Sequence, residues 1–199
     1  LWNATRFCEM NECAVDPTYD PATCRHAANR WIVGAAMKTA REMTVALDSY
    51  RFNEAAGAIY QFSWGTFCDW YLEFIKPILA GDDAAAQAEA RATTAWTLDT
   101  ILKLLQPFMP FLCEEIWQRT RAAETGLLML GAWPDDATSR GNLVIDEDAS
   151  HEMEWVIRLI SQVRAVRSEM NVPPGAQIPM HLIDANAQTK ERLGKHREL

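Results

Sequence analysis

The chain has 199 residues, of which 49% are hydrophobic and 10% aromatic, and its formal net charge is −8. This length and composition predict a globular protein with one large domain, or one domain plus an appendage. No run approaches the roughly 18 apolar residues of a membrane helix, and the first residues lack the charged-then-apolar order of a secretion signal, so a membrane partner and an extracellular location are excluded.

Helical periodicity dominates the chain. Apolar side chains recur at spacings of three and four over residues 27–50, which predicts a long amphipathic helix. A second apolar stripe follows Asn53 and is expected to end near Pro77 and Gly81-Asp82-Asp83, where the proline and glycine are expected to stop the helix. The side chains of this second stripe that are expected to face inward are Ala56, Ile59, Tyr60, Phe67, Tyr71 and Phe74.

Three more helices are predicted, over residues 84–105, after Pro110, and over 150–171. The segment 123–149 is rich in Gly, Pro and Asp and is predicted to be an acidic loop. We therefore expect a mainly α protein with a helical-bundle domain over residues 1–149.

The last residues have a different pattern. Consecutive prolines and a glycine at Pro173-Pro174-Gly175 break the helical periodicity. Residues 178–183 have strand-like composition, and 187–199 return to a helical pattern. Residues 150–199 are therefore predicted to be a helix followed by the start of a small α/β unit. Because the chain begins with Leu1 and both ends fall in helical patterns, we expect it to be part of a longer protein.

Motifs for catalysis are missing. The sequence has no Gly-rich phosphate loop, no His-Glu-x-x-His helix, no Gly-x-Ser-x-Gly elbow and no dinucleotide fingerprint, so no catalytic residue and no cofactor are assigned.

The five cysteines form no Cys-x-x-Cys pair, which argues against a disulfide framework. Four side chains of the right type for zinc occur near the N-terminus, but their spacing is irregular and buried thiols are the favoured interpretation, so no metal site is assigned. These are Cys8, Cys13, Cys24 and His26.

A basic face on the helix predicted over 27–50 is the main candidate for binding. Arg30, Lys38 and Arg41 share this face with Gly34, opposite the apolar stripe. Helix statistics alone favour an ordinary solvated face. Trp31, at the border of the face, favours RNA, because unstacked bases stack on aromatic rings while cations hold phosphates. As a core residue, Trp31 would be equally ordinary.

Net acidity does not exclude RNA. Residues 52–154 carry six basic and seventeen acidic side chains, whereas residues 155–199 carry seven basic and four acidic ones. A local basic patch is sufficient for phosphate binding, so binding is expected to be confined to such a patch and to be sensitive to salt.

Several motifs together resemble one protein family over essentially the whole chain. They are Leu-Trp-Asn-Ala-Thr-Arg-Phe at 1–7, Asn-Arg-Trp-Ile at 29–32, Arg-Phe-Asn-Glu-Ala-Ala at 51–56, Phe-Cys-Asp-Trp-Tyr-Leu-Glu-Phe-Ile-Lys-Pro at 67–77, Pro-Phe-Met-Pro-Phe-Leu at 107–112 and Arg-Ala-Val-Arg-Ser-Glu at 164–169. This set resembles the anticodon-binding region of the valyl-tRNA synthetases, which are class I aminoacyl-tRNA synthetases. The first and third motifs are shared loosely with isoleucyl and leucyl relatives, so an isoleucyl fragment is one alternative. A helical module that binds a protein through its acidic middle is another.

The resemblance implies RNA contacts. In these synthetases the segment at 29–34 usually has Asp, Leu and Ser where this chain has Asn29, Val33 and Gly34. Arg30 and Trp31 match and are carried over as tRNA-binding residues, whereas Gly34 is not. Asn29 is expected to keep an oxygen for capping or a turn. The remaining candidates for tRNA binding are Lys38, Arg41, Asn3, Arg6, Arg164 and Arg167, with an interdomain role as the alternative for Asn3 and Arg6.

The resemblance also implies a longer parent. The parent would be a cytoplasmic ligase that uses ATP and Mg²⁺ to attach valine to its tRNA. Its catalytic domain, with His-Ile-Gly-His and Lys-Met-Ser-Lys-Ser signatures, and its editing domain would lie outside this chain. The fragment is therefore expected to bind the anticodon loop of a valine tRNA and to be inactive alone.

Overall fold

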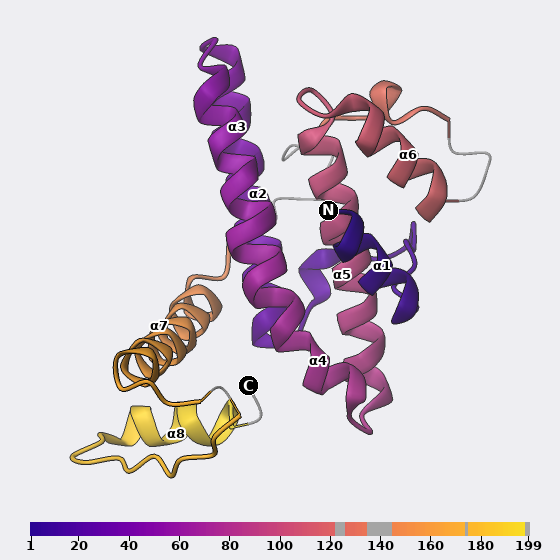
Figure 1. Ribbon diagram of the computed structural model, residues 1–199. Coiled ribbons are helices and arrows are strands. Elements are labelled where there is room, and N and C mark those ends of the chain that lie inside the picture. The colour runs from indigo at the N-terminus through magenta and orange to yellow at the C-terminus, as the bar shows by residue number, and fades with distance from the viewer. Residues whose placement is uncertain (122–125, 135–144, 174, 198–199) are drawn as a thin grey trace.

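The computed structural model describes residues 1–121, 126–134, 145–173 and 175–197. Long helices pack side by side, and a smaller C-terminal segment lies next to α7 (Figure 1). In chain order the elements are α1 (Trp2–Met10), η1 (Pro21–Thr23), α2 (Ala27–Asp48), α3 (Phe52–Tyr60), η2 (Gln61–Tyr71), α4 (Leu72–Ala80), α5 (Ala84–Leu105), α6 (Pro110–Thr120), η3 (Leu128–Leu130), α7 (Glu147–Glu169) and α8 (Ala187–Lys195). The described ranges contain no strand, so the prediction of a mainly α bundle is confirmed. No helix in these ranges has the length and apolar character needed to cross a membrane.

Helix α2 is the centre of the bundle. It contacts α3, α5 and α7, and its apolar stripe is buried against them. Ile32, Ala36 and Met43 of this stripe have no exposed surface. The helix predicted over 27–50 is therefore present at Ala27–Asp48 with these side chains inward, whereas Tyr50, just past its end, is 81% exposed.

The next three elements form one continuous helix from Phe52 to Ala80. Its middle part, η2, is π-helical. The helix continues through Pro77 to Ala80, so the predicted end near Pro77 and Gly81 is confirmed, although the proline itself lies inside the helix. Pro77 lies in the last turn, where the missing backbone N–H removes one hydrogen bond and the helix ends four residues later at Gly81.

Helix α5 packs against α2 and α4; its first two residues are exposed, and most of its residues from Ala90 onward are buried. It begins at Asp83, whose side chain accepts hydrogen bonds from the backbone N–H groups of Ala85 and Ala86 at 2.9 and 3.1 Å. Its buried threonines satisfy their hydroxyls internally, as in the bond from Thr94 to the carbonyl of Ala90 at 2.6 Å. The predicted bounds of 84–105 are confirmed.

The C-terminal segment differs from its prediction. Residues 178–183 form no strand, because no second strand pairs with them in the described chain. The segment is held instead by side chains. Arg167 donates to the carbonyls of Pro173 and Ala176, both at 3.0 Å. Glu152 on α7 binds Lys195 at 2.7 Å and His196 at 2.5 Å, which ties the end of α8 to α7.

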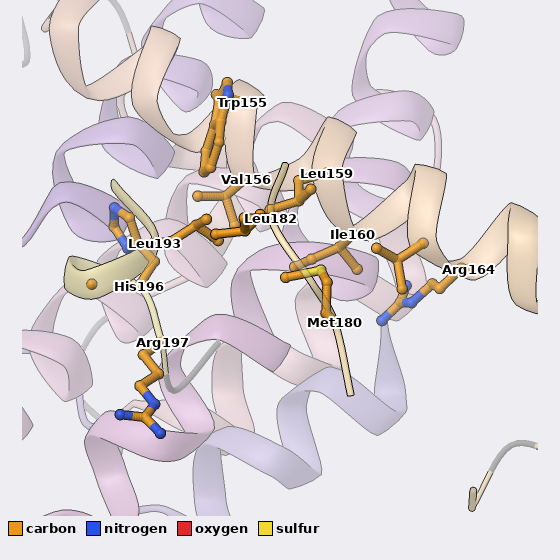
Figure 2. A pocket seen from close by; sticks show the side chains of 12 residues that line it. Trp155, Val156, Leu159, Ile160, Arg164, Met180, Leu182, Leu193, His196 and Arg197 are labelled. Carbon is orange, nitrogen blue, oxygen red and sulfur yellow. The ribbon is translucent and has the colours of Figure 1, made fainter. Parts of the chain in front are cut away.

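An apolar cavity of about 620 Å³ lies under this segment, between α7 and α8 (Figure 2). Its walls are mainly aliphatic, and the side chains of Val156, Ile160, Met180, Leu182 and Leu193 point into it. Much of the predicted acidic loop over 123–149 lies outside the described residues, including the whole of 135–144.

The N-terminus of α2 is held by a carboxylate from α5. Glu89 accepts hydrogen bonds from the backbone N–H groups of Arg25 and His26 at 3.1 and 2.9 Å, and from Nδ2 of Asn29 at 2.8 Å. Asn29 is fully buried and its Oδ1 accepts a hydrogen bond from the Tyr71 hydroxyl at 2.9 Å. The expected capping role of Asn29 is therefore wrong, since Glu89 takes that role and Asn29 links α2 to η2.

We expect the substitution Glu89→Gln to destabilise the fold above pH 5 and to matter less in acid. Partial burial acts to raise the pKa of Glu89, but the hydrogen bonds from Asn29, His26 and Arg25 outweigh it and lower the pKa below 4.5. A lowered folded-state pKa stabilises the fold above the ordinary pKa, and this contribution is lost as the pH falls through the folded value. Urea denaturation at pH 7 should show a loss of about 1–2 kcal/mol. A loss that is equal at pH 7 and pH 3 would contradict this assignment.

Candidate nucleic-acid interface

The predicted basic face of α2 lies next to α7. Arg30 forms an ion pair with Asp146, with 2.7 Å between Nη1 and Oδ2. Asp146 also caps α7, because its Oδ1 accepts a hydrogen bond from the N–H of Ala149 at 2.8 Å. Arg30 is therefore paired within the fold, and its role in tRNA binding stays a prediction. Sequence periodicity could not show this, because Asp146 is 116 residues away.

Trp31 is placed in the core rather than at the border of an exposed face. Its side chain is only 7% exposed, and its ring lies 6.1 Å from that of Phe74. Phe74 in turn lies 5.7 Å from Trp70 on η2. A ring enclosed in this way offers no free face for a base, so the prediction of an exposed Trp31 is wrong.

A groove of about 530 Å³ runs between α2, η2 and the start of α7. Lys38 lines it and is exposed. The acidic side chains Glu147 and Glu154 line its α7 side, so its charge is mixed rather than basic. The remaining lining residues are Trp31, Gly34, Ala35, Gly65, Thr66, Trp70, Ile145, Ser150 and Ile157.

Two other predicted residues belong to α7. The Arg164 guanidinium lies over the ring of Trp70, 5.1 Å from its centroid, so it flanks the groove. Arg167 donates to backbone carbonyls of the C-terminal segment, which is a structural use of its guanidinium. Arg41 is half-buried on α2, one turn after Lys38.

Asn3 and Arg6 lie elsewhere. Both are exposed on α1, which contacts α5 and α6 rather than α2 and α7. The structure therefore places Trp31 and Lys38 in the lining of one groove, with Arg164 over its lining residue Trp70. Asn3 and Arg6 are on α1, which packs against α5 and α6.

Two exposed aromatic rings near this groove were missed by the sequence analysis. Tyr60 and Trp64 are parallel, with an interplanar angle of 3° and 6.3 Å between ring centroids. Their side chains are 65% and 53% exposed. We call this pair the aromatic platform. Tyr60 was predicted to face inward, so that prediction is wrong.

The aromatic platform adjoins the groove. Gly65 follows Trp64 directly and lines the groove together with Lys38. The amide of Gln61 lies over Gly65, because a Cβ there would be 2.4 Å from Gln61 Nε2. The exposed parallel rings therefore lie on the same continuous helix, at the end of α3 and in η2, as the Gly65 wall of the groove. An i, i+4 pair of aromatics in the sequence was the available sign of this arrangement.

The four residues considered for zinc do not converge. The Sγ of Cys24 shares a hydrogen bond with the Tyr19 hydroxyl, 2.9 Å away. Cys8 and Cys13 lie in and just after the last turn of α1. Burial raises the pKa of Cys24 above its ordinary value, which keeps the thiol protonated at neutral pH. Among the described residues, no group of three or more His, Cys, Asp or Glu side chains is arranged to hold a metal ion.

Comparison with known proteins agrees with this architecture. Residues 29–182 match the family described as the anticodon-binding domain of tRNA ligase. The chain is 49% identical over 203 residues to valine–tRNA ligase of Caulobacter vibrioides, with 100% of the chain and 22% of the relative covered. It is 47% identical over 199 residues to the valine–tRNA ligase of Brucella suis, covering 98% of the chain and 21% of the relative. The corresponding enzyme of Bradyrhizobium diazoefficiens is 45% identical over 221 residues, with 96% and 23% covered.

The chain thus spans between a fifth and a quarter of the length of these curated relatives. The family match covers the helices that build the groove, from α2 to α7, and continues to residue 182. The chain belongs to the family of anticodon-binding domains of tRNA ligases.

Proposed function

We propose that this chain binds the anticodon stem-loop of a valine tRNA as part of a valine–tRNA ligase. The family match over residues 29–182 is the observation that carries the proposal. The relatives that match the chain over nearly its whole length are valine–tRNA ligases, which favours valine over the isoleucyl alternative.

The aromatic platform is the part of the surface best suited to a base. Single-stranded RNA is bound by stacking of unpaired bases on aromatic side chains, with cations on the phosphates. Tyr60 and Trp64 offer exposed parallel rings, and Lys38 is a cation in the adjoining groove. Arg41 and Arg164 lie on the same two helices as the groove and are assigned to flanking phosphates.

Arg30 and Trp31 are assigned an indirect role. Arg30 connects α2 to the cap of α7, and Trp31 packs against Phe74. Together they position α2 and α7, which form two sides of the groove. Asn3 and Arg6 are assigned to contacts with the rest of the parent chain, because α1 lies away from the groove.

Binding should distinguish valine from isoleucine RNA. The central A and the following C are common to the anticodons of all valine tRNAs. We expect the chain to bind a valine anticodon stem-loop more tightly than an isoleucine stem-loop in an electrophoretic titration. Equal affinity for both RNAs would contradict valine specificity, and no affinity for either would favour a protein-binding module.

The parent protein is proposed to be a cytoplasmic enzyme that uses ATP and Mg²⁺. No catalytic motif is present in this chain, so we expect it alone to show no valine-dependent exchange of pyrophosphate into ATP and no charging of tRNA. The full-length enzyme of Caulobacter vibrioides is a suitable positive control. Exchange above the blank, with the control active, would show that part of the catalytic domain lies within these residues.

A further inference from the structure

The turn that ends α1 brings two cysteines together. Glu12 follows the helix in the left-handed conformation, with φ of 59°. The N–H of Cys13 donates to the carbonyl of Cys8 at 2.9 Å, and that of Glu12 donates to the carbonyl of Glu9 at 3.3 Å. This pair of bonds is the Schellman arrangement, in which the two outer side chains contact each other. In most proteins that contact is apolar, whereas here both outer side chains are thiols.

The two thiols differ in exposure and acidity. Cys8 is 2% exposed and Cys13 is half-buried. The hydrogen bond between the thiols, together with burial, raises the pKa of Cys8 well above its ordinary range. The same hydrogen bond lowers the pKa of Cys13 despite partial burial, and the charge of Arg91 lowers it further. Cys13 is therefore the more accessible and the more acidic thiol of the pair.

Arg91 is held in place beside the turn. Its Nε donates to the carbonyl of Asn11 at 3.0 Å, and its Nη2 lies 3.7 Å from Oε2 of Glu12. The guanidinium thus spans the turn from α5 and keeps a positive charge next to Cys13. A partly exposed thiolate beside a fixed cation is the environment of a reactive cysteine.

We propose that Cys8 and Cys13 form a reversible disulfide when the protein meets hydrogen peroxide. The Cys13 thiolate attacks one peroxide oxygen, so that a sulfur–oxygen bond forms and the oxygen–oxygen bond breaks. The hydroxide that leaves takes up the proton that Cys13 released on ionising and becomes water. Cys8 sulfur then attacks Cys13 sulfur, the sulfur–oxygen bond breaks, and the Cys8 proton joins the departing hydroxide as water. Peroxide is reduced to two waters, and two thiols are oxidised to one disulfide.

The backbone geometry favours this pair over one that involves Cys24. The backbone hydrogen bond from the N–H of Cys13 to the carbonyl of Cys8 holds the two residues within one turn, which suits the limited reach of a disulfide. Cys24 is held by Tyr19 and Thr93 in a separate cluster. Oxidation would fasten the last turn of α1 to the loop that follows it.

The test counts free thiols after exposure to peroxide. The reduced and desalted chain is treated with hydrogen peroxide, unfolded, labelled with N-ethylmaleimide and weighed by mass spectrometry. We expect the number of labelled thiols to fall from five to three, and dithiothreitol to restore all five. Retention of five thiols, or a loss that dithiothreitol does not reverse, would overturn the proposal.

Three variants identify the pair. C13S and C8A should each keep all four of their thiols under the same treatment, whereas the matched control C24S should fall from four to two. C13S changes a half-buried residue, so circular dichroism can confirm that it is folded. A pair of thiols still lost in folded C13S would assign the disulfide to other cysteines and contradict the proposal.

Discussion

Replacing Tyr71 with alanine is expected to lower the free energy of unfolding by about 3–5 kcal/mol. Tyr71 is fully buried, and its ring lies 5.9 Å from that of Phe67. Its hydroxyl donates to Asn29 at 2.9 Å and lies 3.4 Å from the Thr94 hydroxyl. Alanine would leave a cavity between η2, α2 and α5 and an unpaired amide oxygen on Asn29. Urea denaturation followed by circular dichroism measures the loss.

Two further variants separate the contributions. Tyr71→Phe keeps the ring and should cost about 1–3 kcal/mol through the unpaired partner alone. Phe52→Ala removes a ring of similar size that is 55% exposed, and should change stability by no more than about 0.5 kcal/mol. If Tyr71→Ala were no more costly than Phe52→Ala, the packing of η2 against α2 would be wrong.

Replacing Trp64 with alanine is expected to weaken binding of the valine anticodon stem-loop by about 1–3 kcal/mol through lost stacking. Trp64 is 53% exposed, so its removal should leave the fold largely intact. Trp31→Ala should behave in the opposite way, because Trp31 is buried. It should lower stability, with a smaller direct effect on affinity when binding is measured well below the melting temperature. Fluorescence anisotropy of a labelled stem-loop measures affinity.

Matched controls make this result specific. Trp2→Ala removes a tryptophan that is 40% exposed on α1 and should leave affinity unchanged. Lys38→Ala should weaken valine and base-substituted RNAs about equally and flatten the salt dependence by roughly one unit of slope. If the unsubstituted chain binds RNA and the Trp64→Ala variant binds it as tightly, the aromatic platform is not the stacking surface. If the unsubstituted chain binds no RNA, the proposed function itself fails.

The long helices could be predicted well from the sequence, and the reasons are local. Helix α5 has an aspartate cap at Asp83 and apolar positions at helical spacing, and its predicted bounds are the observed ones. Helix α7 was predicted over 150–171 and is found at Glu147–Glu169, because Asp146 caps it earlier than the apolar stripe begins. Periodicity locates a helix, and side-chain caps decide where it starts.

The surface of the site was predicted less well, because long-range contacts decide it. Arg30 is paired by an aspartate more than a hundred residues away, and Trp31 is covered by Phe74. Tyr60 was placed on the wrong face for a different reason. Helix α3 buries Ala55 and Ile59, and Tyr60 follows Ile59 by about 100° around the axis. Tyr60 is therefore exposed, whereas Phe67 and Tyr71 of η2 are buried as predicted.

The π-helical segment also determines where this helix can change in length. A π-helical turn holds one residue more than an α-helical turn for the same rotation about the axis, since its hydrogen bonds run from i to i+5. Deleting one residue from η2 would tighten one such turn to ordinary pitch, so α3 and α4 would keep their packing against α2 and α5. The same deletion in α5 would rotate every following buried side chain by about 100° and bring polar faces into the core. The helix from Phe52 to Ala80 displays the aromatic platform. By this argument it can also lose a residue from η2 and keep its packing.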